Sequence, residues 1–451
     1  MYHLPYKPSE PLDENMMLFY SDPDFSGNCL SFWEYVKKNT SYKIVWFVYN
    51  NDRVSKLREL GIECYYINDY ENCSRFFCKA KYVICERVSR HRYPKPEGQI
   101  DVQLMSISHF IADLFSVQAD DNPYDKIYVF SKLRSTYTDF FIANSEFGRI
   151  NTSAIHFADP RKIYVTGSPR YDPMLNEDGK TILLSMFPEL AKFTRFIIYC
   201  PSPCKSNGFE ADSFFVPNIY NLPDLVNNNL EALLYEYNAA VIFKPHPADE
   251  ASLYGKNLKL PRYHYQFDTL SFMGKSIYHV LNAFDIMITD TSQLANEFLL
   301  LDRPILFNRC TYERRLSLVK PIINNDMVVA PGAKHSNAEE FLTDMREALQ
   351  QIDIYSEVRK AACDFHHKFK CGNASERVLS MIEKTSTFND IEHDIFMKSS
   401  TSQHVKTQAE LQLESILKSN SYRFMKKTIK ILCPEGSIRR SFCTRMAKIF
   451  T

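Results

Sequence analysis

The feature that most constrains the fold is a repeated alternation of short, continuously apolar runs with helix-like segments. The alternation begins near the N-terminus and restarts at Phe196. Strands that are apolar at successive positions are buried on both faces, as in a parallel sheet covered by helices. The sequence therefore predicts an α/β protein with two doubly wound, Rossmann-like halves and a cleft between them. The predicted strands are Met16–Tyr20, Tyr42–Tyr49, Glu63–Ile67, Tyr82–Cys85, Phe140–Ala143, Ile163–Thr166, Phe196–Cys200, Val241–Phe243, Ile286–Ile288 and Pro304–Phe307.

The length of the chain, 451 residues, exceeds what one ordinary hydrophobic core holds. A punctuated loop at Gly167–Asp172 and a polar stretch after it place the boundary between the halves at 175–195. We therefore expect Rossmann-like domains over 1–180 and 181–385, followed by a linker and basic tail over 386–451. The predicted helices are Asn28–Lys38, Val54–Leu60, Leu230–Asn238, Tyr278–Phe284 and Gln293–Leu301.

Polar and cationic residues follow two predicted strands of the second half. Lys244 and His246 come after the strand that ends at Phe243, and Thr291 and Ser292 come after the strand that ends at Ile288. In an open parallel sheet, ligands bind outside the carboxyl ends of the strands. A helix N-terminus with free N–H groups and nearby hydroxyls binds anions. We expect these side chains to face one crevice that suits a diphosphate.

Each candidate residue also has a structural interpretation. His246 lies between two prolines and could be a plain surface histidine at a strand end. Thr291 and Ser292 could only cap the helix, although capping and phosphate binding are compatible. Glu297 could accept a hydrogen bond from a ribose hydroxyl or be a solvated surface acid. Arg170 could reach the cleft and match phosphate oxygens bidentately, or pair with an acid.

A general base is harder to find. His109 is the only histidine of the first half that follows an apparent strand, which makes it the candidate base on an acceptor hydroxyl; the alternative is a satisfied, semi-buried histidine. On a helix, the adjacent His366 and His367 would point about 100° apart, which does not favour a shared metal ion. The sequence has no Cys-x-x-Cys pair either, so no metal or other cofactor is predicted.

The charge of the chain is unevenly placed. Nine Lys or Arg and one Glu lie between Lys418 and Thr451, which gives that segment a net charge of +8 and leaves −8 for the rest. Apolar residues recur at helical spacing within Ile438–Phe450, a pattern typical of helices on anionic membrane surfaces. The alternative is a solvated helix docked on the acidic remainder. No nucleic-acid motif accompanies the charge, so nucleic acid is not predicted as a partner.

Targeting segments are not evident. The first residues lack a signal-peptide pattern, and no apolar stretch approaches the ~20 residues that span a bilayer. We expect a cytoplasmic protein, attached peripherally to the inner face of the cell membrane through residues 418–451.

Five motifs give the chain a family resemblance. In their order along the chain they are Val165–Asp172, Lys244–Pro247, Asp285–Ser292, Leu299–Phe307 and Gly372–Arg377. Over about residues 15–385 the chain resembles the CDP-glycerol glycerophosphotransferases, the primases and polymerases of teichoic acid with relatives in capsule synthesis. The resemblance implies a GT-B fold and peripheral membrane attachment. It also implies transfer of a polyol phosphate from a CDP-linked donor to a lipid-linked or polymeric acceptor hydroxyl, with release of CMP.

The resemblance also implies roles for single residues. His246, Thr291 and Ser292 would hold the donor diphosphate, and Arg170 would lie near the cleft. A histidine of the first domain would act as base on the acceptor hydroxyl. Around His109 the sequence reads Ser-His-Phe, where that family usually has Trp-His-Gly-Thr-Pro.

Other functions stay open at this point. One is a GT-B glycosyltransferase that uses a CMP- or UDP-activated sugar for capsule or O-antigen synthesis. Another is a nucleotide-sugar enzyme such as an epimerase, which has no need of a membrane. A third is a binding protein that has kept the fold without turnover.

Overall fold

The computed structural model describes residues 11–86, 93, 95–105, 135–156, 158–201, 220, 222, 224–246, 260–267, 274–290, 292–309 and 330–384. By the contacts among its residues the chain divides into two units, Met1–Ser386 and Thr387–Thr451. All described residues belong to the first unit. The candidate residues His109 and Thr291 and the whole basic tail lie outside the described residues.

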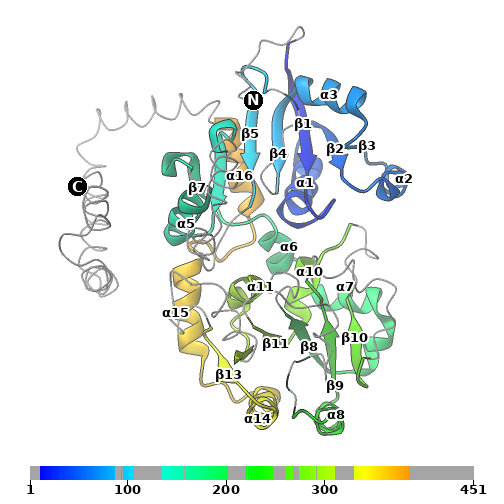
Figure 1. Cartoon of the computed structure of the whole chain (residues 1–451), viewed down its shortest axis with the longest axis vertical. Coiled ribbons are helices and arrows are strands. Elements are labelled where there is room, and N and C mark those ends of the chain that lie inside the picture. The colour runs from blue at the N-terminus through cyan, green and yellow to red at the C-terminus, as the bar shows by residue number, and fades with distance from the viewer. Residues whose placement is uncertain are drawn as a thin grey trace, which may run out of the picture. The chain divides into compact units, whose positions relative to one another are not determined.

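The first sheet has seven parallel strands in the order β3-β2-β1-β4-β5-β6-β7. Six of them follow the order 3-2-1-4-5-6 of doubly wound, dinucleotide-binding folds. The sheet is shown in colours from blue to teal in Figure 1. Its strands are β1 (Asp13–Tyr20), β2 (Lys43–Val48), β3 (Cys64–Tyr66), β4 (Ala80–Cys85), β5 (Ile100–Gln103), β6 (Phe140–Ala143) and β7 (Ile163–Val165).

The second sheet repeats that plan. Its six parallel strands follow the order β10-β9-β8-β11-β12-β13, which is again 3-2-1-4-5-6 in chain order. The strands are β8 (Arg195–Cys200), β9 (Ala239–Phe243), β10 (His264–Gln266), β11 (Ile286–Thr289), β12 (Ile305–Asn308) and β13 (Ala333–His335). The expectation of two doubly wound halves is confirmed.

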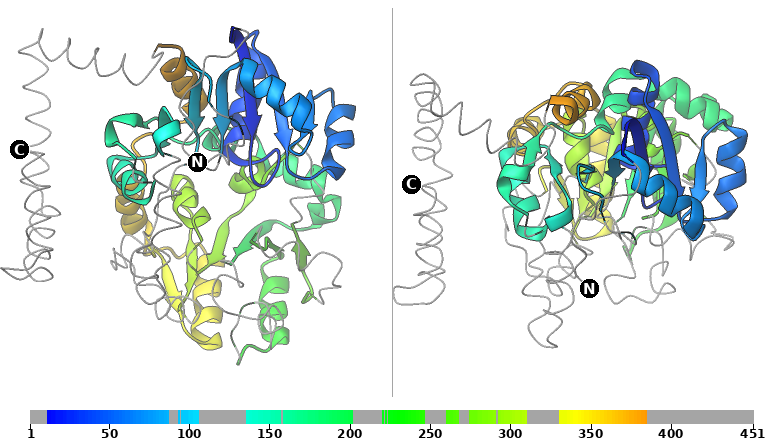
Figure 2. Two further views of the ribbon diagram at one scale, coloured as in Figure 1. Left: turned by 45° about the horizontal axis from the view of Figure 1, so that its top comes forward. Right: turned by 90° about the horizontal axis from the view of Figure 1, so that it is seen from above.

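Helices flank both sheets in all three views (Figures 1 and 2). Those associated with the first sheet are α1 (Gly27–Asn39), α2 (Asp52–Glu59), α3 (Tyr70–Lys79) and α5 (Glu146–His156). The chain then continues through α6 (Tyr171–Asn176), α7 (Gly179–Met186), α8 (Asn227–Glu236), α10 (Ile277–Val280), α11 (Leu294–Phe298), α14 (Ala338–Leu349), α15 (Ser356–His366) and α16 (Ala374–Lys384).

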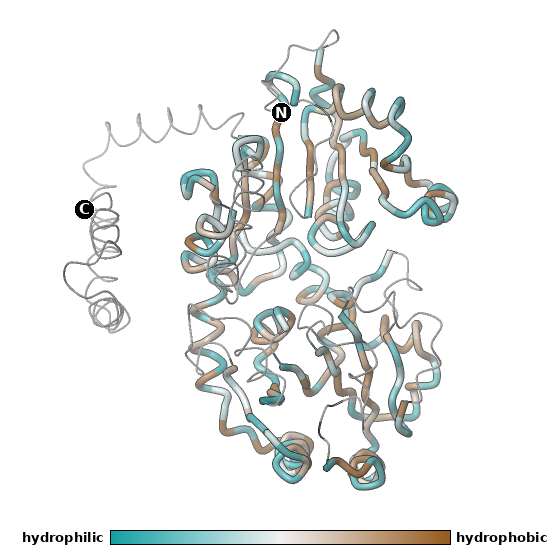
Figure 3. The backbone as a smooth tube through the Cα atoms, viewed as in Figure 1, coloured by the Kyte–Doolittle hydropathy of each residue, from teal (hydrophilic) through white to brown (hydrophobic). Residues whose placement is uncertain are grey.

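The core of the second half lies on both faces of its sheet. Phe196 and Ile198 of β8 belong to one buried cluster, and Ile197 and Tyr199 belong to the other. Successive side chains of a strand point to opposite faces, so an unbroken apolar run fills two cores at once. Figure 3 shows these hydrophobic stretches along the strands.

Some elements differ from those predicted from the sequence pattern. Strand β5 is buried throughout, yet it contains Asp101 and Gln103 and so does not read as an apolar run. The helix predicted at Gln293–Leu301 is present as α11 followed by one 3-10 turn, Leu299–Leu301. Helix α16, which the prediction assigns to the second domain, packs against α1 and α6 instead. Among the described residues, no helix combines the length and apolarity needed to cross a bilayer.

Candidate functional site

The candidate donor residues lie at the carboxyl edge of the second sheet. Lys244 and His246 follow β9, and Ser292 follows β11. The two strands are not adjacent in the sheet, because β8 lies between them. With neighbouring strands about 4.8 Å apart, the two strand ends are separated by about 10 Å. Strand order also reverses between β8 and β11, which is where ligands bind in doubly wound folds.

Two charged residues lie around the end of β8. The backbone N–H of Lys244 donates to the Tyr199 carbonyl oxygen at 2.8 Å, and its ammonium group donates to the Pro245 carbonyl oxygen at 3.1 Å. Burial raises the pKa of the Cys200 thiol to about 12, while Lys244 pulls that pKa down and Asp290 pushes it up. Lys244 and Asp290 both influence the pKa of Cys200, the last residue of β8. A cation and an acid therefore lie near this strand end.

The hydroxyls at the end of β11 have structural partners. Thr289 is fully buried and donates to the Cys200 carbonyl oxygen at 2.7 Å, which ties β11 to β8. Ser292 is half-buried, and its hydroxyl accepts from the backbone N–H of Leu294 at 3.4 Å. The N-cap residue of α11 is Gln293, which makes no side-chain cap bond, so Ser292 contacts the first residue of the helix from the position before the cap. A hydroxyl at the start of a helix can exchange its place with a phosphate oxygen.

Arg170 and Glu297 form an ion pair. The Arg170 guanidinium donates through Nη2 to Glu297 Oε1, and its Cζ atom lies 5.0 Å from the centre of the Tyr278 ring. The Glu297 side chain has no exposed surface, and that of Arg170 is 11% exposed. Glu297 is therefore not a solvated surface acid, and its role toward a ribose stays a prediction. For Arg170, pairing with an acid is the arrangement observed.

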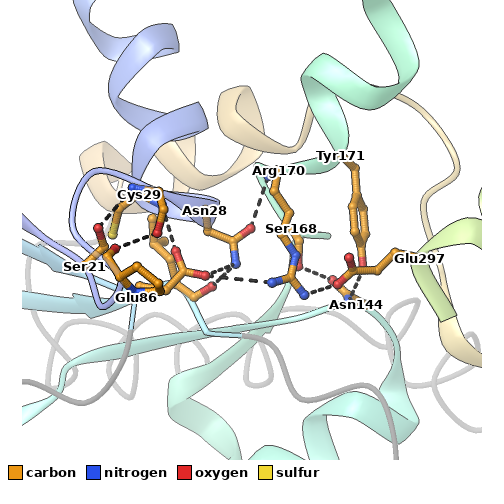
Figure 4. A network of polar contacts seen from close by, with 12 residues as sticks. Ser21, Asn28, Cys29, Glu86, Asn144, Ser168, Arg170, Tyr171 and Glu297 are labelled. Carbon is orange, nitrogen blue, oxygen red and sulfur yellow. Dashed lines mark hydrogen bonds and ion pairs between the residues drawn. The ribbon is translucent and has the colours of Figure 1, made fainter. Parts of the chain in front are cut away.

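A second carboxylate, that of Glu86, lies on the other side of Arg170 (Figure 4). Its Oε1 is 3.9 Å from Arg170 Nη1 and accepts from the Asn28 side-chain amide at 3.0 Å. Its Oε2 accepts from the backbone N–H of Cys29 at 2.9 Å, in the first turn of α1. Glu86 therefore occupies the position where an anionic ligand binds a helix N-terminus.

The start of α1 is built around this carboxylate. Gly27 has φ +60°, and a Cβ there would lie 2.8 Å from three atoms of the Glu86 side chain. Only glycine combines that backbone conformation with that approach at little cost. The strand order of the first sheet reverses between β1 and β4, so Glu86 fills the position at which the first half would otherwise take a ligand.

The pKa values of the two acids reflect their burial. Burial raises the pKa of the Glu297 carboxyl, against the effects of Arg170 and of the Tyr278 hydroxyl. Burial also raises the pKa of Glu86, against Arg170 and the N–H groups at the start of α1. For Arg170 burial alone would lower the pKa, but Glu297 in particular raises it, so the guanidinium stays charged. One buried cation thus stabilises two buried carboxylates.

Sequence reasoning overlooks Glu86 and Asn28. A signal for Glu86 exists, because it directly follows the predicted strand Tyr82–Cys85 and so obeys the same strand-end rule as Lys244. For Asn28 no signal exists, because its role depends on the approach of Arg170, whose backbone N–H donates to Asn28 Oδ1 at 3.1 Å.

Two of the motifs behind the resemblance are in contact. Asp172 accepts from the backbone N–H groups of Ala374 at 2.7 Å and Ser375 at 2.8 Å, and so caps α16. In return, Arg377 donates through Nε to the Thr166 carbonyl oxygen at 2.6 Å. The motifs Val165–Asp172 and Gly372–Arg377 thereby attach α16 to the connection that leaves the first sheet.

His367, the second of the two adjacent histidines, has a structural role in this geometry. His367 is buried, its Nε2 lies 2.7 Å from the Asn296 carbonyl oxygen, and its ring packs edge-on against Tyr171. Burial lowers the pKa of His367 to about 3, so the ring is neutral and Nε2 is the donor. Within the described ranges, no three His, Cys, Asp or Glu residues are grouped so as to hold a metal ion.

Comparison with solved structures shows the fold. The wall teichoic acid polymerase TagF superimposes with a TM-score of 0.64 at 17% sequence identity, covering 85% of this chain and 90% of the polymerase. A form of that polymerase soaked with CDPG for 15 minutes gives a TM-score of 0.65 over the same shares. The GT-B expectation is confirmed.

Comparison of sequences shows the family. The teichoic acid glycerol-phosphate primase of Bacillus subtilis (strain 168) is 25% identical over 256 residues, which are 56% of this chain. The match spans 59% of the primase, less than two thirds of its length. The family model described as CDP-Glycerol:Poly(glycerophosphate) glycerophosphotransferase matches residues 3–384, most of the chain. The chain therefore belongs to the CDP-glycerol:poly(glycerophosphate) glycerophosphotransferase family.

Proposed function

We propose that this protein transfers a polyol phosphate, such as glycerol phosphate, from a CDP-linked donor to a hydroxyl of a lipid-linked or polymeric acceptor. One structural observation carries the proposal beyond family membership. The segments that begin with Lys244 and with Asp290 flank the end of β8, where the strand order of the second sheet reverses. The corresponding position of the first sheet is filled by Glu86, which favours the second half as the donor domain.

The donor residues suit a diphosphate. Lys244 supplies a positive charge, and Ser292, with the adjacent Thr291, supplies hydroxyl donors at the start of a helical segment. We assign His246 to the phosphate that leaves with the nucleotide, as a hydrogen-bond donor or an acid. We leave Arg170 and Glu297 out of this assignment, because their side chains are paired with each other.

The reaction follows from these roles. The acceptor hydroxyl oxygen attacks the phosphorus that carries the polyol, a new P–O bond forms, and the P–O bond to CMP breaks. CMP leaves with the electron pair of that bond, and the hydroxyl proton passes to a base. We assign the base to His109, as the family resemblance implies. Positively charged and N–H donors aimed at the phosphates stabilise the charge that develops on the leaving oxygen.

A donor panel tests the function. Purified protein is incubated with CDP-glycerol, CDP-ribitol, CMP-sialic acid and UDP-sugars in the presence of an acceptor, and the released CMP, CDP or UDP is quantified. CMP from a CDP-alcohol is the expected result. Nucleotide released only from a CMP- or UDP-sugar would replace the phosphotransferase with a glycosyltransferase, and no release from any donor would favour a binding protein.

His246→Ala tests the donor site. We expect transfer to be lost, with a decrease in turnover of at least about 100-fold, which is the low end for a residue that takes part in proton transfer. Arg195→Ala is the matched control, because Arg195 lies at the amino end of β8, on the opposite edge of the same sheet. Unchanged turnover in His246→Ala, or an equal loss in Arg195→Ala, would contradict the site.

We further propose that residues 418–451 attach the enzyme to the anionic inner face of the cytoplasmic membrane, where a lipid-linked acceptor would lie. The net charge of +8 in this segment and its apolar residues at helical spacing support the proposal. Residues 1–417 should lose binding to vesicles that contain anionic lipid, while the full chain binds and is released by salt. Vesicle binding by residues 1–417 would refute the assignment.

A further inference from the structure

One residue of the connection between the two halves contacts both of them. Arg170 precedes α6, on the segment that leads from the first sheet to the second. From the first half, Asn28 Oδ1 accepts its backbone N–H at 3.1 Å, and Glu86 lies 3.9 Å from its guanidinium. From the second half, it is paired with Glu297 of α11 and packed on the Tyr278 ring of α10. Figure 4 shows Arg170 between Glu86 and Glu297.

The energetics of burial make these contacts interdependent. A buried charge without a partner is strongly unfavourable, and removing one member of a buried ion pair leaves the other uncompensated. The Glu297 carboxylate is fully buried, and Glu86 is nearly so. Moving α11 away from Arg170 would leave Glu297 without its cation. The position of α11 is therefore coupled to that of the first half through a single side chain.

The consequence for the donor site comes from the position of Glu297 in the sequence. Glu297 lies five residues after Ser292, whose hydroxyl accepts from the backbone N–H of Leu294, the first residue of α11. A displacement of α11 is therefore transmitted directly to the hydroxyl-bearing segment after β11. The neighbouring residue Asn296 is held as well, because its carbonyl oxygen accepts from His367. Helix α11 is thus fixed at two successive residues by segments outside the second sheet.

We propose that Arg170 is a positioning residue for transfer: by holding Glu297 it sets the place of Ser292 and of the segment after β11. The inference rests on the proposed function for its catalytic consequence. The coupling between Arg170 and α11 rests on the contacts alone. Arg170 acts through α11 and does not itself bind the donor phosphates.

The test measures the position of α11 and the reaction separately, on the full chain. Hydrogen exchange read by mass spectrometry follows the amides of Leu294–Phe298, and CMP release from CDP-glycerol gives kcat and KM. The variants are Arg170→Met, Arg170→Lys and Glu297→Gln. The matched control is Glu34→Gln, which removes the negative charge from another contact between the halves, the one at 3.2 Å from Glu34 of α1 to His279 of α10.

We expect Arg170→Met to speed exchange at α11 about tenfold, as local opening becomes easier, and to leave α8 unchanged. We expect its kcat to fall on the order of 100-fold with little change in KM, because misplacing a positioning group by about 1 Å has that effect. Glu297→Gln should act in the same direction, and Arg170→Lys, which keeps the charge, should recover part of the loss. Glu34→Gln should change neither the exchange at α11 nor kcat.

Three results would overturn the inference. They are unchanged exchange at α11 in both Arg170→Met and Glu297→Gln, faster exchange with unchanged kcat, and equal effects in the Glu34→Gln control. If wild-type protein releases no CMP from CDP-glycerol or CDP-ribitol, the proposed function fails instead. The exchange data alone then decide whether Arg170 positions α11. Should Arg170→Met not fold, Arg170→Lys and Glu297→Gln carry the same comparison.

Discussion

The buried ring of His367 gives the protein a specific sensitivity to acid. Its pKa is lowered from 6.5 to about 3 by burial, so the folded protein binds fewer protons there than the unfolded chain does. The stability that the neutral ring contributes is fully present above pH 6.5 and is lost as the pH falls toward 3. At pH 5, which is 1.5 units below the unfolded pKa of 6.5, protonation of His367 in the unfolded chain lowers the free energy of unfolding by ~2 kcal/mol.

His367→Gln isolates this contribution, because a glutamine amide can still donate to the Asn296 carbonyl oxygen but does not titrate. Urea unfolding at pH 7 and pH 5 gives the change in unfolding free energy for each protein. We expect wild type to lose ~2 kcal/mol more than the variant between these pH values.

Other titrating groups cancel in this comparison. The raised pKa values of Glu86 and Glu297 act in the opposite sense, since they make stability fall as the pH rises above their unfolded values. Both acids are present in wild type and variant, so the difference reports His367. Burial also lowers the pKa of His264, to about 4. His264→Gln should therefore likewise reduce the loss of unfolding free energy between pH 7 and pH 5. An identical pH dependence in wild type and His367→Gln would refute the reasoning.

Two further changes test the packing around the site, both by urea unfolding. Gly27→Ala forces the Glu86 carboxylate from the start of α1 and should lower stability by roughly 3 kcal/mol or more. Its control is Gly61→Ala, which has a similar φ of +73° but no atom within 4 Å; it should lose only ~1 kcal/mol, and an equal loss would contradict the contact. Asp172→Ala uncaps α16 and should lose ~1–2 kcal/mol, whereas an unchanged midpoint would show that the cap contributes nothing.

The arrangement of the second sheet illustrates how much of the site is readable in the sequence. Each strand predicted there is present within a few residues, because an unbroken apolar run can be satisfied only by burial on both faces. The location of Lys244, His246 and Ser292 at one edge follows from the parallel direction of β9 and β11. That β8 separates them does not follow, because the order of strands depends on crossover connections and leaves no mark in local periodicity.

The burial of polar residues cannot be predicted from the apolar pattern of the sequence. In β5, Asp101 and Gln103 are as buried as the valine between them. An apolar pattern does not predict a buried strand that contains such residues. The same limit applies to Glu297, which sequence reasoning leaves as a surface acid or a ribose ligand. A charged residue can be buried only beside a partner, and the partner here is 127 residues away in the chain.

The sequence by itself determined the two doubly wound halves, the strand ends that carry the donor residues, and the family. These depend on local patterns and short motifs, which a chain displays before it folds. The tertiary structure decided that Glu86 takes the anion position of the first half, that Arg170 joins the two halves, and that α16 returns to α1. Each of these depends on which distant groups meet in a water-poor interior, where an unpaired charge is too unfavourable to persist.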